Sequence, residues 1–387
     1  MGRIAIVGGG IGGLTAAISC AEEGAEVLLL EAHAALGGRA RSADGPYKAN
    51  FGPHVLYKGG AQWDWLRERD LLPAHRGAPL APIRFRWQGS IRRTPPLASA
   101  PSVLRLRGRE APVDRDFRGW VADHAGEQTA QMLSAAAGVY TFHHDPGELS
   151  AAFIWQRTVR ALLTAPLPAR YLVGGWDSLV DRLEGRARGL GVRIETGHRA
   201  ESLPDPPVIV ATELDRAREL LADSSLKWLS GRTVCIDLGL SHRRGDPFVV
   251  SDLDEAGWLE RYSAADRSLA PSGEELIQAQ MPIRPGEGSD GAGQRLERLL
   301  DLSLPEWRQR QTWHRRQVLE ARSGALDLPG TTWRDRPAVD RGDGVFLVGD
   351  MVAAPGLLSE VSWASALEAS GLALEAVGAK RAALRAA

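Results

Sequence analysis

The chain has 387 residues and a formal net charge of −1, from 47 basic and 48 acidic residues. This balance gives no electrostatic case for nucleic acid binding, and no apolar run approaches the roughly 20 residues of a membrane-spanning helix. The two cysteines, Cys20 and Cys235, are far apart in apolar sequence, so they predict no disulfide and no metal site, and a cytoplasmic location is expected.

The N-terminal segment predicts a strand, a glycine-rich turn, a helix and a second strand. An apolar run at Ile4–Val7 leads directly into the turn, and a second apolar run, Val27–Leu30, ends on Glu31. The turn glycines have the spacing G-x-G-x-x-G, at Gly8, Gly10 and Gly13. This order of elements, closed by an acid, is typical of the βαβ unit that binds the ADP half of a dinucleotide.

Each residue of this unit has a physical role. Gly8 permits the tight turn, Gly10 lets backbone approach a pyrophosphate, and Gly13 lets the helix pack closely on the strand. The helix N-terminus at Ile11 offers free N–H groups and a partial positive charge to the phosphates. Glu31 is expected to accept hydrogen bonds from the adenosine ribose hydroxyls, and an acid at this position disfavours a 2′-phosphate and therefore NADP.

A glycine pair and an arginine follow the acid, at Gly37, Gly38 and Arg39. This segment resembles the extended signature of the flavin amine oxidase and phytoene desaturase superfamily, which ordinary nicotinamide dehydrogenases lack. The resemblance implies FAD as the cofactor, with the glycine pair bringing backbone to its pyrophosphate and Arg39 beside it. It also implies an α/β fold: a Rossmann-like FAD-binding domain with a parallel sheet, built from discontinuous segments, and a second α+β substrate domain containing an antiparallel sheet.

The C-terminal part resembles the same superfamily. An apolar run at 344–348 ends in Gly349 and Asp350, and the family's aspartate hydrogen-bonds the ribityl chain or the pyrophosphate of FAD. The turn at Pro355-Gly356 and a helix beginning near Leu358 are similar to the segment that carotenoid desaturases place under the flavin. A helix N-terminus aimed at the flavin would stabilise the negative charge of its reduced form.

An interior stretch at 47–56 resembles the acidic-x-glycine-proline segment that crosses the flavin face in desaturases. Asn50 stands where the family has an acid, while Gly52 and Pro53 match. His54 comes next and is the candidate catalytic residue near the flavin face, where it would tune the ring or orient the substrate. A structural histidine that caps the turn is the alternative interpretation.

These landmarks divide the chain into two domains. We predict the FAD-binding domain from residues 1–75, 170–232 and 330–387, and the substrate domain from 76–169 and 233–329. Three apolar runs separated by polar turns, at 234–240, 248–251 and 276–281, indicate an antiparallel sheet over the flavin.

A helical stretch at 151–163 carries six large apolar side chains with Arg157 and Arg160 interspersed. Burial against its own domain is the favoured interpretation, and contact with a membrane surface or with a lipophilic tunnel is the alternative. The expected partner is a small, mainly apolar substrate.

The sequence therefore predicts an FAD-dependent oxidoreductase that dehydrogenates or desaturates a lipophilic or secondary-metabolite substrate by hydride transfer to flavin N5. A flavin amine oxidase is the alternative, although many of its relatives hold a lysine near N5, and this chain has no lysine between Lys227 and Lys380. Rab GDP-dissociation inhibitors share the fold without flavin, but the intact Glu31, Arg39 and Asp350 argue against such a binding protein. Flavin-dependent sugar-nucleotide mutases fit the later landmarks less well.

Overall fold

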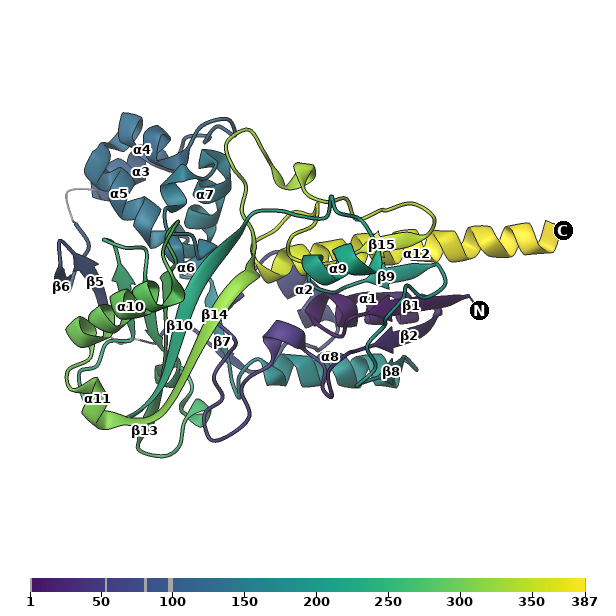
Figure 1. The fold of residues 1–387 in the computed structure, drawn as a ribbon, viewed down its shortest axis with the longest axis horizontal. Helices are drawn as coiled ribbons and strands as arrows, with labels where there is room; N and C mark the ends of the chain where they lie inside the picture. The colour runs from purple at the N-terminus through teal and green to yellow at the C-terminus, as the bar shows by residue number, and fades with distance from the viewer. Residues whose placement is uncertain (1, 53, 80–81, 97–99, 387) are drawn as a thin grey trace.

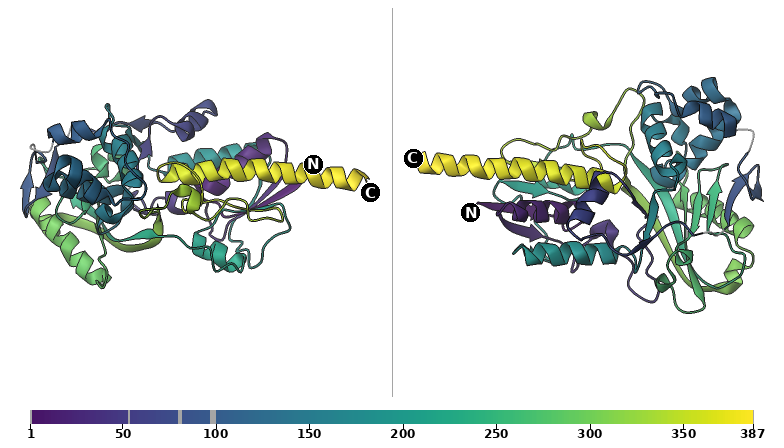
Figure 2. Two further views of the ribbon diagram at one scale, coloured as in Figure 1. Left: turned by 90° about the horizontal axis from the view of Figure 1, so that it is seen from above. Right: turned by 180° about the vertical axis from the view of Figure 1, so that it is seen from behind.

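A computed structural model describes residues 2–52, 54–79, 82–96 and 100–386. A parallel sheet with its helices forms one half of the molecule, and a larger sheet with a cluster of short helices forms the other (Figure 1). The long C-terminal helix runs past the parallel sheet, so that both termini lie at the same end of the molecule (Figures 1 and 2).

The parallel sheet draws its strands from three separate parts of the chain. Its strand order is β15-β9-β1-β2-β8, and every neighbouring pair is parallel. The strands are β1 (Arg3–Val7), β2 (Glu26–Leu30), β8 (Arg193–Glu195), β9 (Val208–Val210) and β15 (Val345–Leu347). The predicted Rossmann-like sheet from discontinuous segments is therefore confirmed, whereas the residue boundaries of the two domains stay a prediction.

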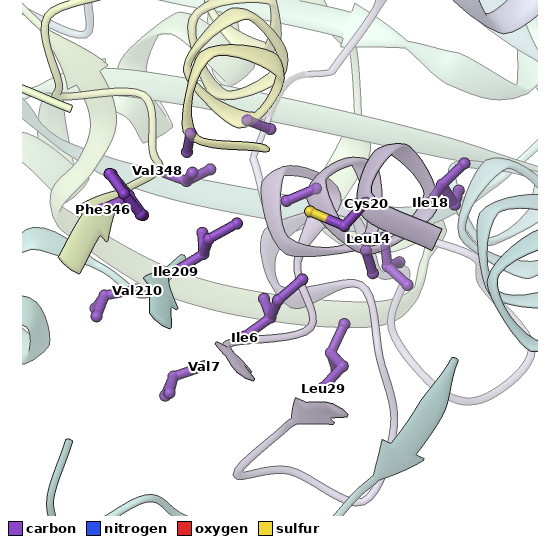
Figure 3. Close-up of a cluster of buried hydrophobic side chains, with 14 of the residues drawn as sticks. Ile6, Val7, Leu14, Ile18, Cys20, Leu29, Ile209, Val210, Phe346 and Val348 are labelled. Atoms are coloured by element: carbon purple, nitrogen blue, oxygen red, sulfur yellow. The ribbon is translucent and has the colours of Figure 1, made fainter. Parts of the chain in front are cut away.

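Helices cover this sheet because its strands are apolar on both faces. Helix α1 (Ile11–Glu22) contacts both α8 (Asp177–Gly189) and α12 (Ser359–Ala386). Ile6 and Leu29 on the strands and Ile18 on α1 are fully buried in one cluster (Figure 3). The Cys20 thiol lies in the same cluster, where burial raises its pKa to about 11.

The larger sheet has seven strands in the order β14-β10-β13-β12-β11-β5-β6. Its members are β5 (Ile83–Trp87), β6 (Ser90–Arg92), β10 (Ser230–Ser241), β11 (Val249–Asp252), β12 (Trp258–Arg261), β13 (Glu274–Pro282) and β14 (Gln311–Ala325). The three apolar runs become β10, β11 and β13. The antiparallel expectation holds for every pair except β5 and β11, which are parallel. A long connection through the helical cluster separates these two strands in sequence, so no hairpin constrains their direction.

The remaining elements surround these two sheets. A small sheet contains β3 (Leu56–Tyr57), β7 (Ala169–Leu172) and β4 (His75–Arg76). The helical cluster contains α3 (Ala100–Leu106), α4 (Phe117–Ala125), α5 (Glu127–Ala136), α6 (Gly138–Thr141) and α7 (Ala151–Thr158). The other helices are α2 (Ala61–Glu68), α9 (Leu214–Leu220), α10 (Ser289–Ser303) and α11 (Trp307–Arg310).

The predicted helix at 151–163 consists of α7 and one π-helical turn, Val159–Leu163. Phe153, Ile154 and Trp155 are each at most 5% exposed and belong to the core of the helical cluster. This burial agrees with the favoured interpretation, while contact with a membrane surface stays a prediction. Over the described ranges, no helix combines the length and apolar character needed to cross a membrane.

Candidate functional site

The glycine-rich turn after β1 contains two glycines that the fold requires and one that it does not. Gly8 has φ +108°, and a Cβ there would lie 2.5 Å from the carbonyl oxygen of Ala211. A Cβ at Gly13 would lie 1.9 Å from the carbonyl oxygen of Gly8, because α1 starts tightly against the turn. Gly10 has φ −72°, which any residue adopts, and a Cβ there would meet nothing within 4 Å. The chain itself therefore does not explain the glycine at position 10.

The N-terminus of α1 lies beside this open space. The helix begins at Ile11, no side chain caps it, and no acid occupies its first turn. The second glycine pair contacts the same turn: the Gly37 N–H donates to the Gly9 carbonyl at 2.8 Å, and a Cβ on Gly38 would lie 3.5 Å from Gly10 Cα. Two glycine segments and the positive end of a helix dipole thus converge on one point.

Glu31 lies at the end of β2 with its side chain only 7% exposed. Its Oε2 accepts a hydrogen bond from the Gly9 N–H at 2.7 Å. Its Oε1 accepts from the His33 N–H at 2.8 Å and lies 2.7 Å from His33 Nδ1. The carboxylate therefore holds the glycine turn in place, and Oε2 keeps one lone pair for an expected ribose hydroxyl.

An ion pair joins the N-terminal and C-terminal motifs, which are 311 residues apart. Arg39 Nη1 lies 2.6 Å from Asp350 Oδ2 and also donates to the Arg322 carbonyl at 2.6 Å. The two side chains are 33% and 16% exposed. Burial raises the pKa of Asp350, but the charge and hydrogen bond of Arg39 outweigh it and hold that pKa below its ordinary value. The adjacent Gly349 N–H donates to Ser365 Oγ of α12.

His54 lies on the segment that was expected to cross the flavin face, although Pro53 falls outside the described residues. Its N–H donates to the Tyr262 hydroxyl at 2.9 Å, and its Nδ1 lies 2.6 Å from the Gly52 carbonyl oxygen. A carbonyl only accepts, so Nδ1 carries the proton and Nε2 of the neutral ring is an acceptor. Burial and, to a smaller extent, the charge of Arg39 outweigh the Gly52 hydrogen bond and lower the pKa of His54 to about 4.

The second sheet fixes this segment through its backbone. Asn50 donates its N–H to Gln278 Oε1 at 3.1 Å, and its carbonyl accepts from Gln278 Nε2 at 2.9 Å and from Arg315 Nη2 at 2.5 Å. Arg315 is paired in turn with the buried Asp237 at 2.7 Å. These hydrogen bonds involve the main chain of Asn50, so they do not depend on whether an asparagine or an acid stands at this position.

The turn before α12 is strained in a way that fixes the start of the helix. Gly356 has φ +129°, and a Cβ there would lie 2.6 Å from Glu360 Cβ. Leu358 adopts the left-handed φ of +54°, and α12 begins one residue later, as predicted. Glu360 accepts a hydrogen bond from the Leu357 N–H at 3.0 Å and pairs with Arg160. The positive end of this helix therefore already has an acidic partner.

Polar side chains with no role predicted from the sequence lie beside this turn. Arg157 of α7 donates to the Gly356 carbonyl, and Arg160 donates to the Gly59 carbonyl at 2.8 Å. Tyr140 is buried nearby, with its hydroxyl 2.6 Å from Thr158 Oγ1. Helical periodicity predicted the apolar face of α7, but no spacing in the sequence indicates that its arginines meet a turn near the C-terminus.

The donor set of this region fits a dinucleotide pyrophosphate. The open space at Gly10 accommodates a group that approaches the backbone, and the neighbouring donors are main-chain N–H groups at a helix N-terminus. The hydroxyl of Ser42, three residues after Arg39, is buried and has no hydrogen-bond partner within the described chain. The residues present therefore fit FAD, and nothing in the turn obstructs it.

Comparison with known proteins supports the same fold. The family described as the NAD(P)-binding Rossmann-like domain matches residues 6–68, whereas no curated protein sequence matches the chain. An oxidoreductase from Methanosarcina mazei has a TM-score of 0.77 and 16% identity, covering 95% of this chain and 99% of its own. Cyclohexylamine oxidase from Brevibacterium oxydans has a TM-score of 0.70 and 14% identity, covering 96% and 99%.

Reduced UDP-galactopyranose mutase is similar over a comparable length, with a TM-score of 0.71 and 13% identity, covering 97% of this chain and 96% of its own. At such identities the similarity concerns architecture, and it spans nearly the whole chain. Residues 6–68 thus match the NAD(P)-binding Rossmann-like domain family, and the chain shares over most of its length the fold of these two oxidoreductases and of the mutase.

Proposed function

We propose that the protein is an FAD-dependent oxidoreductase. The observation that carries the proposal is the Arg39–Asp350 contact of 2.6 Å, which brings both flavin-type motifs to one point beside the open space at Gly10. When bound, FAD would supply a two-electron acceptor that takes a hydride from a substrate C–H or C–N bond. The protein binds the cofactor and the substrate, orients them toward each other and shields them from water.

Different residues hold the two halves of the cofactor in this proposal. The first-turn N–H groups of α1 and the glycine turn bind the pyrophosphate, and Glu31 accepts from the adenosine ribose. Asp350 lies three residues after the end of β15 and accepts from the ribityl chain. Arg39 holds Asp350 ionised and in place. His54 offers an unprotonated Nε2 that orients the substrate or accepts a proton from it.

We favour dehydrogenation or desaturation of a substrate with an apolar body. The apolar side chains of Phe153 and Leu357 lie near the turn before α12, and the described lysines Lys48, Lys58 and Lys227 are all exposed. A lysine-assisted amine oxidase site therefore has no candidate among them. Amine oxidation remains the second candidate, favoured by the similar architecture of cyclohexylamine oxidase.

The deciding experiment is the visible spectrum of the purified protein, followed by anaerobic reduction. Bound FAD gives flavin absorption bands, and a folded colourless protein that does not take up added FAD would contradict the proposal. In FAD-loaded protein, unsaturated or cyclic hydrocarbon-like substrates are expected to bleach these bands faster than simple amines. Rapid bleaching by primary or secondary amines alone would favour the amine oxidase.

A further inference from the structure

Arg157 lies on α7, where the helical cluster meets the turn that precedes α12. Its guanidinium carbon is 3.6 Å from the centre of the Phe153 ring, so one face of the group is covered. Its Nη2 donates to the Gly356 carbonyl at 3.2 Å, and its Nη1 donates to the Phe153 carbonyl at 3.2 Å. The guanidinium is therefore held in place by neutral groups, and the residue is half-buried.

The acids nearest to Arg157 already have partners. Asp327 accepts from Nε and Nη2 of Arg336 at 2.9 and 2.7 Å, in a pair that is almost completely buried. Glu360 is paired with Arg160. Among the described residues, Arg157 itself forms no ion pair with a carboxylate within 4.0 Å. Burial, reinforced by the charge of Arg336, lowers the pKa of Arg157 to about 10.

This environment is unfavourable for a cation in the absence of an anion. Half-burial removes part of the hydration of the guanidinium, and no carboxylate of the described residues contacts it, so the more distant Asp327 and Glu360 offset this cost only in part. An arginine offers five N–H donors in a fork that matches a carboxylate, and the two carbonyls accept from only two of them. The remaining donors are thus available at the same turn that opens α12.

We propose that the substrate of this protein carries a carboxylate, which binds to Arg157 while the apolar body of the substrate lies toward the flavin. This inference rests on the proposed function, because the turn at Gly356 belongs to the segment predicted to lie under the flavin. The aromatic ring of Phe153 covers one face of the guanidinium, and the buried Tyr140 is close enough to act on its charge. They favour a small organic acid with an aromatic or unsaturated body.

The test uses benzoate and benzamide, which share a shape and differ in charge. FAD-loaded protein is titrated with each, and binding is measured by the change in the flavin spectrum and independently by the rise in melting temperature. Benzoate is expected to bind and benzamide to bind far more weakly. Arg157→Gln should weaken benzoate binding by about 10- to 100-fold, as for loss of a charged hydrogen-bonded partner. Arg157→Lys should retain part of it.

A matched control is Arg188→Gln, which removes an exposed arginine of α8 that is paired with Glu184 and should leave benzoate binding unchanged. Equal binding of benzoate and benzamide would overturn the inference, as would benzoate binding that Arg157→Gln leaves intact. An Arg157-dependent response to inorganic phosphate without one to benzoate would exclude the carboxylate. A changed flavin reduction potential in Arg157→Gln with unchanged benzoate affinity would assign Arg157 to the cofactor instead.

The two proposals fail in different ways. Protein that lacks FAD but still shows benzoate stabilisation that depends on Arg157 contradicts the oxidoreductase and supports the carboxylate site. Protein that holds FAD but shows no spectral or thermal response to benzoate contradicts the carboxylate site alone.

Discussion

A substitution at Gly10 is expected to change FAD affinity without lowering the stability of the folded apoprotein. Gly10 has a backbone conformation open to any residue, and a Cβ there meets nothing within 4 Å. Gly10→Ala should therefore leave the apoprotein as stable as the parent chain or slightly more so. Gly13→Ala provides the contrast, because its Cβ would lie 1.9 Å from the Gly8 carbonyl oxygen and force the backbone of α1 away from the turn.

The magnitudes follow from these contacts. In an open site with compatible backbone, Gly→Ala raises the free energy of unfolding by about 0.4–1 kcal/mol through the unfolded chain. Overpacking at Gly13 should lower it by about 1–3 kcal/mol or more. The new methyl at Gly10 would separate the pyrophosphate from a backbone donor, and a hydrogen bond to a charged group contributes about 1.5–3 kcal/mol. FAD affinity should then fall by about 10- to 150-fold, and further in Gly10→Val.

The assay is FAD titration of apoprotein by fluorescence quenching, with urea unfolding of the same preparations. Gly185→Ala is the control, since Gly185 is exposed in α8 and a Cβ there also meets nothing within 4 Å. It should bind FAD as the parent chain does. If Gly10→Val purified as folded protein with full FAD content, the position of the pyrophosphate in this turn would be wrong.

Three further predictions concern the charged groups. Asp350→Asn leaves Arg39 without its anion, so FAD should bind at least about 10-fold more weakly. Because Arg39 holds the pKa of Asp350 low, the ion pair stabilises the parent chain at neutral pH. This stabilisation is lost as the pH falls through that lowered pKa. The melting temperature should therefore fall less steeply with decreasing pH in Asp350→Asn than in the parent chain, and an equally steep fall would contradict the pairing. His54 has a folded pKa of about 4 against 6.5 ordinarily, so stability should fall from pH 6.5 to 4 in the parent chain and less in His54→Gln, as measured by melting temperature against pH. Glu31→Gln retains an acceptor for the Gly9 N–H, whereas Glu31→Ala removes it. The alanine variant should therefore lose more FAD affinity and more apoprotein stability than the glutamine variant. Identical losses in the two variants would show that the Gly9 contact contributes nothing.

The sequence was sufficient where the constraint is local. Gly8 and Gly13 occur at fixed spacing between two apolar strands, and each spacing encodes a turn or a close approach that depends only on neighbouring residues. The helix start near Leu358 and the strand before Gly349 were predictable for the same reason. The parallel pairing of β5 with β11 was not, since the direction of a distant strand depends on the route of the intervening chain.

Contacts between distant segments were also not predictable from the sequence. The motifs predicted that Arg39 and Asp350 approach the same cofactor, but not that they contact each other. A sequence motif compares side chains, so Asn50 differs from the acid of the family. The second sheet binds the main chain of Asn50, and a sequence motif does not record that contact. Arg157 reads as the polar side of an amphipathic helix, and its partner at Gly356 is 199 residues away.

In the proposed site, the charge pattern explains why the sequence predicts cofactor contacts but no substrate contact. Arg39, Arg160 and Arg336 each meet a carboxylate, so in the proposed site they bring little free positive charge to a phosphate. Pyrophosphate binding then depends on main-chain N–H groups, whose arrangement is encoded by glycines in a short motif. In the proposed site, substrate binding depends instead on the side chain of Arg157, which lacks a carboxylate contact because Arg336 and Arg160 pair with the nearby acids. Such an arrangement leaves no periodic signal in the sequence.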